Sequence, residues 1–269
     1  MSSPLFHRFS FRAFGVEFEV KTNAPELLER LKRHFPPGFS NGKGRASVAY
    51  TLTDFRRRTG RYEIRDDEGE IARSTRLEDV LKSFESRLGI RIAEMAPRRV
   101  FVHAGVVARK DRVILLPGRS FTGKTTLVRE LIRSGADYYS DEYAVLDSRG
   151  NVHPFPRALE IRASGSFNQR KVKPEVYGAR IGQEPLPVGL VVLSSFDPES
   201  RWKPRKLSPG RAALALLLNT IPARRTPHNA LQVIERVVSS ATSVSSKRGE
   251  ASETASAILQ YFDDLHADN

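Results

Sequence analysis

The chain contains no cysteine among its 269 residues. Disulfide bonds, thiolate metal sites and a cysteine nucleophile are therefore excluded. It also has no run of about 18 apolar residues, the length that a bilayer-spanning helix requires. Its first residues include no apolar segment of the kind found in secretory signals. From these absences we predict a cytoplasmic protein that does not have the membrane as a partner.

Charge is strongly unbalanced toward the basic side. The chain carries 44 Lys and Arg residues against 31 Asp and Glu residues, a net charge of +13. Such a surface attracts nucleic acid, anionic lipid, acidic proteins or polyphosphates. The densest basic run, Arg56 to Arg58, lies between strand-like segments, and we interpret it as a solvated hairpin loop. Because no nucleic-acid-binding module is evident, nucleic acid is not favoured as a partner.

Hydrophobic periodicity divides the chain into two parts. Residues 10–75 alternate strand-like segments with one helix at 24–34, which predicts a small mixed α/β unit with an antiparallel sheet. A second helix is predicted at 77–96 and interpreted as a bridge. We therefore predict a small N-terminal α/β unit at 1–96 and a larger domain at 97–269.

Strands dominate the start of the larger domain, and helices dominate its end. The strands are predicted at 100–108 and 112–116, near 138–139, and at 143–146, 154–161 and 189–196, all in one sheet. The helices are predicted at 207–221, 229–241 and 253–265. The serine-rich stretch 239–246 is interpreted as a helix end followed by a loop. No internal repeat is visible.

Residues Gly118 to Thr126 read G-R-S-F-T-G-K-T-T and match the phosphate-binding pattern G-x-x-x-x-G-K-[ST] in full. A strand-forming run at 112–116 precedes them, and a segment with helical spacing at 127–132 follows. Strand, glycine loop and helix are the setting that this pattern requires. A chance glycine turn before a helix is the alternative interpretation. The context favours binding of a nucleoside triphosphate, and we expect ATP.

Each part of this loop has a defined task in phosphate binding. The glycines let several backbone N–H groups turn toward one anion, and the helix N-terminus adds a positive dipole end. Lys124 can reach the β- and γ-phosphates, and the Thr125 hydroxyl suits Mg²⁺. The residues expected to bind the nucleotide are Gly118, Ser120, Thr122, Gly123, Lys124, Thr125 and Thr126.

Asp141 and Glu142 form an acidic pair directly after a short strand-like segment. A carboxylate placed there can hold Mg²⁺ against the phosphates, or it can accept a proton from an attacking hydroxyl. The alternative is a turn that carries two acids without a chemical role. Proximity in sequence to the phosphate loop favours the functional interpretation.

Three further residues are weaker candidates when taken alone. A lone strand histidine such as His103 more often has a structural role than a catalytic one. Glu160 can complete a metal shell, or it can simply pair with Arg157 or Arg162. Asp197 ends an apolar run that superficially resembles the second motif of nucleotide-binding proteins, and we interpret that run as a buried strand.

In this order, the motifs resemble those of HPr kinase/phosphorylase. That family carries a His-Gly strand, a glycine loop ending in Gly-Lys-Ser/Thr, an Asp-Asp pair and a Glu-Ile-Arg-Gly signature. The corresponding segments here are His103-Ala104-Gly105, Gly118 to Thr125, Asp141-Glu142 and Glu160-Ile161-Arg162-Ala163. The resemblance covers residues 98–165 and extends more loosely toward residue 240.

The resemblance implies a phosphoenolpyruvate-carboxykinase-like P-loop kinase core with a mixed sheet, to which the small N-terminal α/β unit is added. It also implies an ATP- and Mg²⁺-dependent kinase that transfers the γ-phosphoryl group to a hydroxyl of a protein, peptide or small molecule. By the same resemblance, the catalytic residues are Asp141 as general base, Lys124 as phosphate clamp and His103 beside the transferred phosphate, and the metal ligands are Thr125, Glu142 and Glu160.

Two other functions remain open at this stage. One is a nucleotide-binding regulatory protein with little transfer activity, and the other is a nucleic-acid-associated ATPase, suggested only by the net charge. The resemblance favours a homo-oligomer by analogy. Three differences from the family pattern, Ala104, Glu142 and Ala163, leave the acceptor undetermined.

Overall fold

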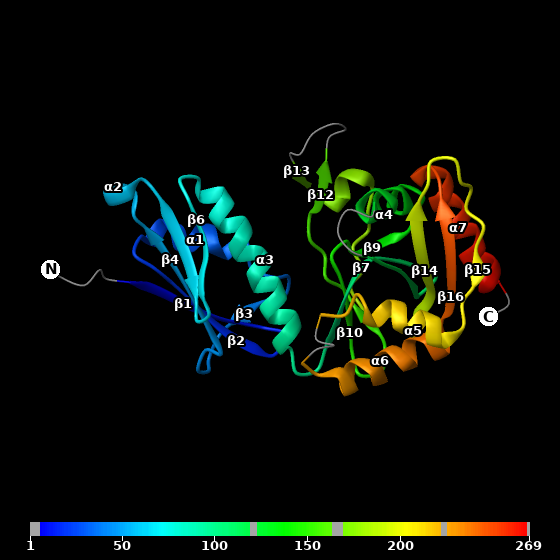
Figure 1. Ribbon diagram of the computed structural model, residues 1–269, viewed down its shortest axis with the longest axis horizontal. Helices are drawn as coiled ribbons and strands as arrows, with labels where there is room; N and C mark the ends of the chain where they lie inside the picture. Colours follow the sequence, from blue (N-terminus) through cyan, green and yellow to red (C-terminus); the bar gives the residue numbers. More distant parts are fainter. Residues whose placement is uncertain (1–5, 119–122, 163–168, 222–224, 268–269) are drawn as a thin grey trace. The chain divides into compact units, whose positions relative to one another are not determined.

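The computed structural model describes residues 6–118, 123–162, 169–221 and 225–267 (Figure 1). The chain forms two compact units, residues 1–98 and 99–269. Each unit has its own β-sheet with helices packed against it, so the prediction of an α/β fold with a mixed sheet is confirmed. No helix within the described ranges combines the length and the apolar character needed to cross a membrane.

The first unit is built on a six-stranded sheet of order β3-β1-β2-β4-β5-β6. Its strands are β1 (His7–Ala13), β2 (Val16–Thr22), β3 (Ser40–Asn41), β4 (Val48–Asp54), β5 (Tyr62–Asp66) and β6 (Gly69–Ser74), and its helices are α1 (Pro25–Lys32), α2 (Arg56–Thr59) and α3 (Leu77–Met95). The ring of Phe84 in α3 lies 5.1 Å from that of Tyr50 in β4 and 6.3 Å from that of Phe35, just after α1. Both long helices therefore cover the same face of the sheet.

Two expectations for this unit are wrong in part. The sheet is mixed and not antiparallel, because β2 and β4 pair in parallel. Parallel neighbours need a crossover connection, and α1 lies in that connection. The basic run is also not a simple loop: Arg56 to Thr59 form one helical turn, α2, between the antiparallel strands β4 and β5.

The second unit is built on an eight-stranded sheet of order β11-β10-β7-β8-β14-β16-β15, with β9 also paired to β7. Its strands are β7 (Val100–Arg109), β8 (Arg112–Pro117), β9 (Asp137–Ser140), β10 (Tyr143–Leu146), β11 (Val152–His153), β14 (Val188–Phe196), β15 (Arg205–Lys206) and β16 (Thr242–Arg248). β12 (Leu159–Arg162) pairs antiparallel with β13 (Gln169–Val172) in a separate two-stranded sheet, so the expectation that a strand at 154–161 continues the main sheet is wrong.

The directions of the strands in the second unit decide which strand ends lie at the same edge of its sheet. β8, β14 and β16 run parallel to one another. β9 and β10 are antiparallel to β7, and β7 is antiparallel to β8. The carboxyl ends of β8, β9, β14 and β16 therefore meet at one edge of the sheet, which is where open α/β sheets bind ligands.

Helices cover both faces of this sheet (Figure 1). On one face, α4 (Lys124–Arg133) and α7 (Ala251–Leu265) share a core with alternate strand residues such as Ile114 and Val192. On the other face, α5 (Pro209–Leu217) and α6 (Pro227–Ser240) pack against the intervening residues, such as Leu115 and Val191. A 3-10 turn, η1 (Pro174–Tyr177), precedes β14.

The serine-rich stretch begins as the predicted helix end, since α6 ends at Ser240, but β16 replaces the loop that was expected to follow. Residues Thr242–Arg248 form a strand inside the sheet, parallel to β14 on one side and antiparallel to β15 on the other. Ser243 and Val244 are buried. The strand brings its last residues to the same sheet edge as the phosphate loop.

Gly105 in β7 permits the close packing of α4 on the sheet. A Cβ atom at this position would lie 2.5 Å from the Cγ2 atom of Val128 in α4. We expect Gly105→Ala to lower the free energy of unfolding by about 1–3 kcal/mol through overpacking. Urea denaturation measures the change, and Val128→Ala in the same chain should restore part of it.

The control for this substitution is Gly210→Ala in α5, where an added Cβ would meet nothing within 4 Å. Alanine favours a helix over glycine, so this variant should be neutral or more stable. Equal destabilisation by both substitutions would mean that contact with Val128 is not the cause.

The α7 helix is tied to the β7–β8 turn by charge. Arg109 donates two hydrogen bonds to the Asp263 carboxylate, at 2.9 and 2.5 Å, and the Lys110 ammonium lies 3.1 Å away. The hydrogen bonds from Arg109 hold the pKa of Asp263 at about 2. Because this folded-state pKa lies below the unfolded value, the stabilisation is complete above about pH 4 and is lost as the pH falls toward 2.

Asp263→Asn should therefore lower the free energy of unfolding by about 1–2 kcal/mol at pH 7, allowing for partial solvent exposure. The difference from the unmodified chain should shrink between pH 4 and pH 2. Thermal denaturation across this range measures it, with the exposed neighbour Asp264→Asn as control. A difference that does not change with pH would exclude the pKa of Asp263 as its origin.

Candidate active site

The glycine loop that matches the phosphate-binding pattern lies between β8 and α4 at the carboxyl edge of the second sheet. β8 ends at Pro117 and α4 begins at Lys124, so strand, loop and helix follow one another as the sequence pattern requires. The Gly118 N–H donates to the carbonyl of His103 at 3.1 Å, which anchors the start of the loop to β7. Ser120 and Thr122, both expected to bind nucleotide, lie outside the described residues.

Gly123 closes the loop in a conformation that favours glycine. Its φ is +79°, and an added Cβ would collide with the Arg248 guanidinium at the end of β16. Arg248 is 3% exposed and donates from Nη2 to the carbonyl of Gly123 at 3.1 Å. The last glycine of the loop is thus held by a buried cation from a distant part of the sequence.

Asp141 and Glu142 lie in the gap between β9 and β10, which pair with successive parts of β7. Ser140, which is 1% exposed, shapes this gap. Its hydroxyl accepts hydrogen bonds from the backbone N–H groups of Glu142, at 3.1 Å, and Tyr143, at 3.0 Å. The carbonyl of Glu142 also accepts from the Ala104 N–H at 3.3 Å. The acidic pair is therefore fixed beside the His103-Ala104-Gly105 segment.

The Asp141 carboxylate reaches the first turn of α4. Its side chain is hydrogen-bonded to Thr125, and the Lys124 charge acts on it. Burial raises the pKa of Asp141 to about 7, and the Thr125 hydrogen bond and Lys124 oppose that rise. The Oδ1 atom is buried and has no hydrogen-bond partner among the described residues. A buried carboxylate oxygen of this kind can accept a proton or bind a cation.

Lys124 and His103 face the same acidic pair. Burial lowers the pKa of Lys124, while the charges of Asp141 and Glu142 raise it. Burial also lowers the pKa of His103, with Glu142 opposing the shift and Lys124 reinforcing it. The His103 ring lies 4.8 Å from that of Tyr143. A neutral imidazole and an ammonium group therefore adjoin the acids.

Glu142 and Glu160 differ in their surroundings. The Glu142 carboxylate accepts a hydrogen bond from Arg157 at 3.0 Å, and the Tyr138 hydroxyl donates to the Arg157 carbonyl at 2.8 Å, which fixes that residue. Glu160 is exposed in β12, yet its charge still acts on Asp141. Arg157, considered in the sequence only as a partner for Glu160, thus binds the second acid of the pair.

The residues present are compatible with Mg²⁺ bound together with nucleotide phosphates. Among the described residues, no group of three or more His, Cys, Asp or Glu side chains is arranged to hold a metal ion alone. Mg²⁺ usually keeps several waters and is bound by one or two protein oxygens plus substrate phosphates. The Thr125 hydroxyl suits that second mode, as does the Oδ1 atom of Asp141, which has no hydrogen-bond partner within the described part of the chain.

The structure thus brings together His103, Gly118, Lys124, Thr125, Asp141 and Glu142. Thr126, also expected to bind nucleotide, is exposed in the first turn of α4. Asp197 follows β14, and its carboxylate pairs with the Lys247 ammonium at 2.9 Å. Asp197 therefore belongs to another part of the sheet edge and does not join the Asp141 cluster.

Ser140 offers a test of how the acidic pair is positioned. Ser140→Ala leaves one buried and one partly buried backbone N–H group without the serine acceptor, so we expect the free energy of unfolding to fall by about 1–3 kcal/mol. Urea denaturation measures this change. Ser134→Ala, at the exposed end of α4, should stay within about 0.5 kcal/mol. Similar values for the two variants would show that the Ser140 hydroxyl does not hold the turn.

Comparison with known proteins yields no family model that matches the chain and no match among curated proteins.

Proposed function

We propose that the second unit is an ATP- and Mg²⁺-dependent phosphotransferase with a hydroxyl acceptor, built on a phosphoenolpyruvate-carboxykinase-like P-loop core. The observation that carries this proposal is the contact between the Asp141 carboxylate and Thr125, directly beside Lys124. A phosphate-binding loop whose helix begins against a buried, incompletely paired carboxylate has the parts that phosphoryl transfer needs.

In this proposal Lys124 and the loop hold the β- and γ-phosphates, and Asp141 receives the proton of the attacking hydroxyl. The acceptor oxygen forms a bond to the γ-phosphorus, the bond from that phosphorus to the bridging oxygen breaks, and ADP leaves with the electron pair. Mg²⁺, when bound, supplies charge neutralisation at the phosphates. Arg157 restrains Glu142, and His103 presents a neutral imidazole beside the two acids.

Incubation with γ-³²P-ATP and Mg²⁺ in a host lysate, followed by separation into protein and small-molecule fractions, tests the proposal. We expect label to appear in one fraction with the unmodified chain and to be lost with Asp141→Asn. The labelled fraction identifies the acceptor class. ATP binding without any transfer would contradict the proposal and would favour a nucleotide-binding regulatory protein.

A further inference from the structure

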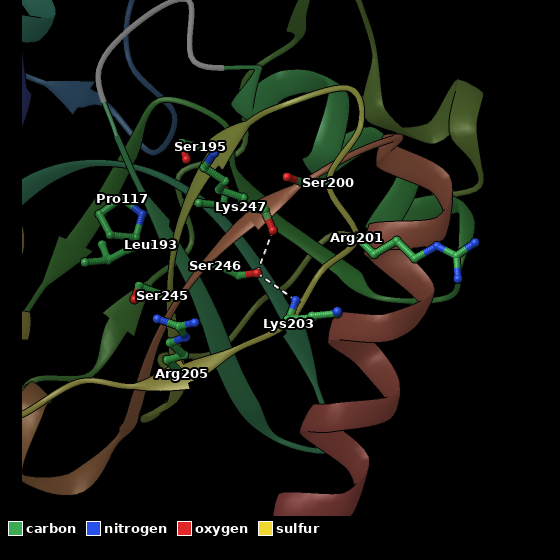
Figure 2. A pocket seen from close by; sticks show the side chains of 11 residues that line it. Pro117, Leu193, Ser195, Ser200, Arg201, Lys203, Arg205, Ser245, Ser246 and Lys247 are labelled. Carbon is green, nitrogen blue, oxygen red and sulfur yellow. Dashed lines mark hydrogen bonds between the residues drawn. The ribbon is translucent and has the colours of Figure 1, made fainter.

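A pocket of about 700 Å³ opens at the carboxyl ends of β8, β14 and β16, beside the phosphate loop. Pro117, the last residue of β8, lines it, and Gly118 comes next in the chain. Leu193 and Ser195 of β14 and Ser245 of β16 also line it (Figure 2). The alternation of these strands places the three side chains on the sheet face that α5 and α6 cover, as for Val191.

The lining of this pocket is suited to an anionic ligand. Four of its side chains are cationic, Arg201, Lys203, Arg205 and Lys247, and five are serines. Among the described residues that line it, none is acidic and none is aromatic. Cations and hydroxyls recognise phosphate oxygens and sugar hydroxyls, whereas a nucleobase is usually bound by aromatic or apolar surfaces.

The surrounding structure holds the side chain of Lys247 and the backbone of Lys203 and Arg205. Lys247 pairs with Asp197 at 2.9 Å. The backbone N–H of Lys203 donates to the Ser246 hydroxyl at 2.8 Å, and Arg205 pairs with Ser245 in the β15–β16 register (Figure 2). Arg201, by contrast, points away from the other side chains in Figure 2. The 201–206 segment is therefore held against β16 as one wall of the pocket.

The sheet order indicates which part of a nucleotide this pocket can receive. Asp141 lies beside β7, on one side of β8, whereas β14 and β16 lie on the other side. In the proposed function the γ-phosphate faces Asp141, and the loop after β8 holds the middle of the triphosphate. The opposite end of the nucleotide therefore extends toward β14 and β16.

We propose that this pocket binds the sugar and α-phosphate end of the donor nucleotide, with Lys203, Arg205 and Lys247 contacting its oxygens. This inference rests on the proposed function, because that function sets the direction of the triphosphate. The segment 201–206 and β16 thereby become part of the donor site, although neither belongs to the phosphate-loop motif.

Binding of three probes to the full chain tests this assignment by calorimetry: ATP, AMP and inorganic tripolyphosphate. AMP has the sugar and α-phosphate without the β- and γ-phosphates, and tripolyphosphate lacks the sugar. Arg205→Ala and, separately, Lys247→Ala should weaken ATP and AMP binding about tenfold, the effect of one charge-assisted hydrogen bond. Both variants should change tripolyphosphate binding much less.

Lys206→Ala is the matched control, because Lys206 is the exposed neighbour of Arg205 on β15 and does not line the pocket. It should leave all three affinities unchanged. Unchanged ATP and AMP affinities in both pocket variants would overturn the inference. An equal loss of affinity for tripolyphosphate would also overturn the inference. The cations would then attract any anion to the phosphate loop by long-range electrostatics, without contacting the sugar or the α-phosphate.

A pocket that serves the acceptor would give a third result: unaltered ATP and AMP affinities with a raised KM for the labelled acceptor, which would also overturn the donor assignment. Failure of the proposed function gives a different pattern. In that case AMP binding still depends on Arg205, but no phosphoryl group is transferred.

Discussion

Replacing Asp141 with Asn should lower the rate of phosphoryl transfer by about 10²–10⁴-fold, the usual contribution of a general base. The substitution keeps the shape of the side chain and an oxygen that can still accept the Thr125 hydrogen bond. It removes the ability to take a proton from the acceptor. Steady-state transfer of γ-³²P from ATP measures the loss.

Nucleotide binding should survive this substitution, because the proposed function assigns the phosphates to Lys124 and the loop. We expect the Kd for ATP, measured by calorimetry, to stay within about threefold, a change of less than 1 kcal/mol. Asp137→Asn is the matched control: it removes an acid from the start of β9, the strand that Asp141 follows, where Asp137 pairs with the exposed Arg180 at 2.7 Å. Full turnover in Asp141→Asn would show that another group accepts the proton.

The sequence predicts the strand and the helix on either side of the glycine loop because their signals are local. A glycine loop needs a strand before it and a helix after it, and the periodicity of 112–116 and 127–132 indicates both; β8 and α4 confirm them. The position of Asp141 and Glu142, directly after a strand-like segment and close to the glycine loop in sequence, indicates the acidic pair. Its surroundings could not be inferred, because Ser140 and Arg157 act through contacts that no local pattern indicates.

β16 shows why the sequence does not predict the rest of the carboxyl edge of the second sheet. Its sequence, Thr-Ser-Val-Ser-Ser-Lys-Arg, reads as a polar loop, yet the strand lies inside the sheet. Strand propensity depends on what a side chain packs against, and at its carboxyl end β16 faces a polar pocket. A serine-rich strand fits that position. No local sequence pattern indicates that Arg248 contacts Gly123 or that Lys247 lines the pocket.

In the first unit, the sequence predicts the strands and the helix better than it predicts the direction of the strands. A helix predicted at 24–34 between two strand-like segments is itself a sign of a crossover, and crossovers join parallel strands. The antiparallel expectation ignored this connection, whereas the observed β2–β4 pair is parallel.

Lys124→Ala should weaken ATP binding by about 3 kcal/mol, which is roughly 100-fold, because it removes a partly desolvated cation from the phosphates. Transfer should become undetectable at ordinary ATP concentrations. The physical reason extends beyond the lost contact. Asp141 and Glu142 both raise the pKa of Lys124, so the lysine also balances their charge. Without it, two carboxylates adjoin the incoming phosphates with less compensation.

Arg133→Ala is the matched control for this variant, since it removes one positive charge from the far end of the same helix, where Arg133 lies 3.6 Å from Glu130. Calorimetric titration with ATP at several salt concentrations separates the local effect from the loss of net charge. The control should change affinity only slightly, and less so as salt screens the field. Equal losses in the two variants would mean that the +13 charge of the chain, and not the phosphate loop, attracts the nucleotide.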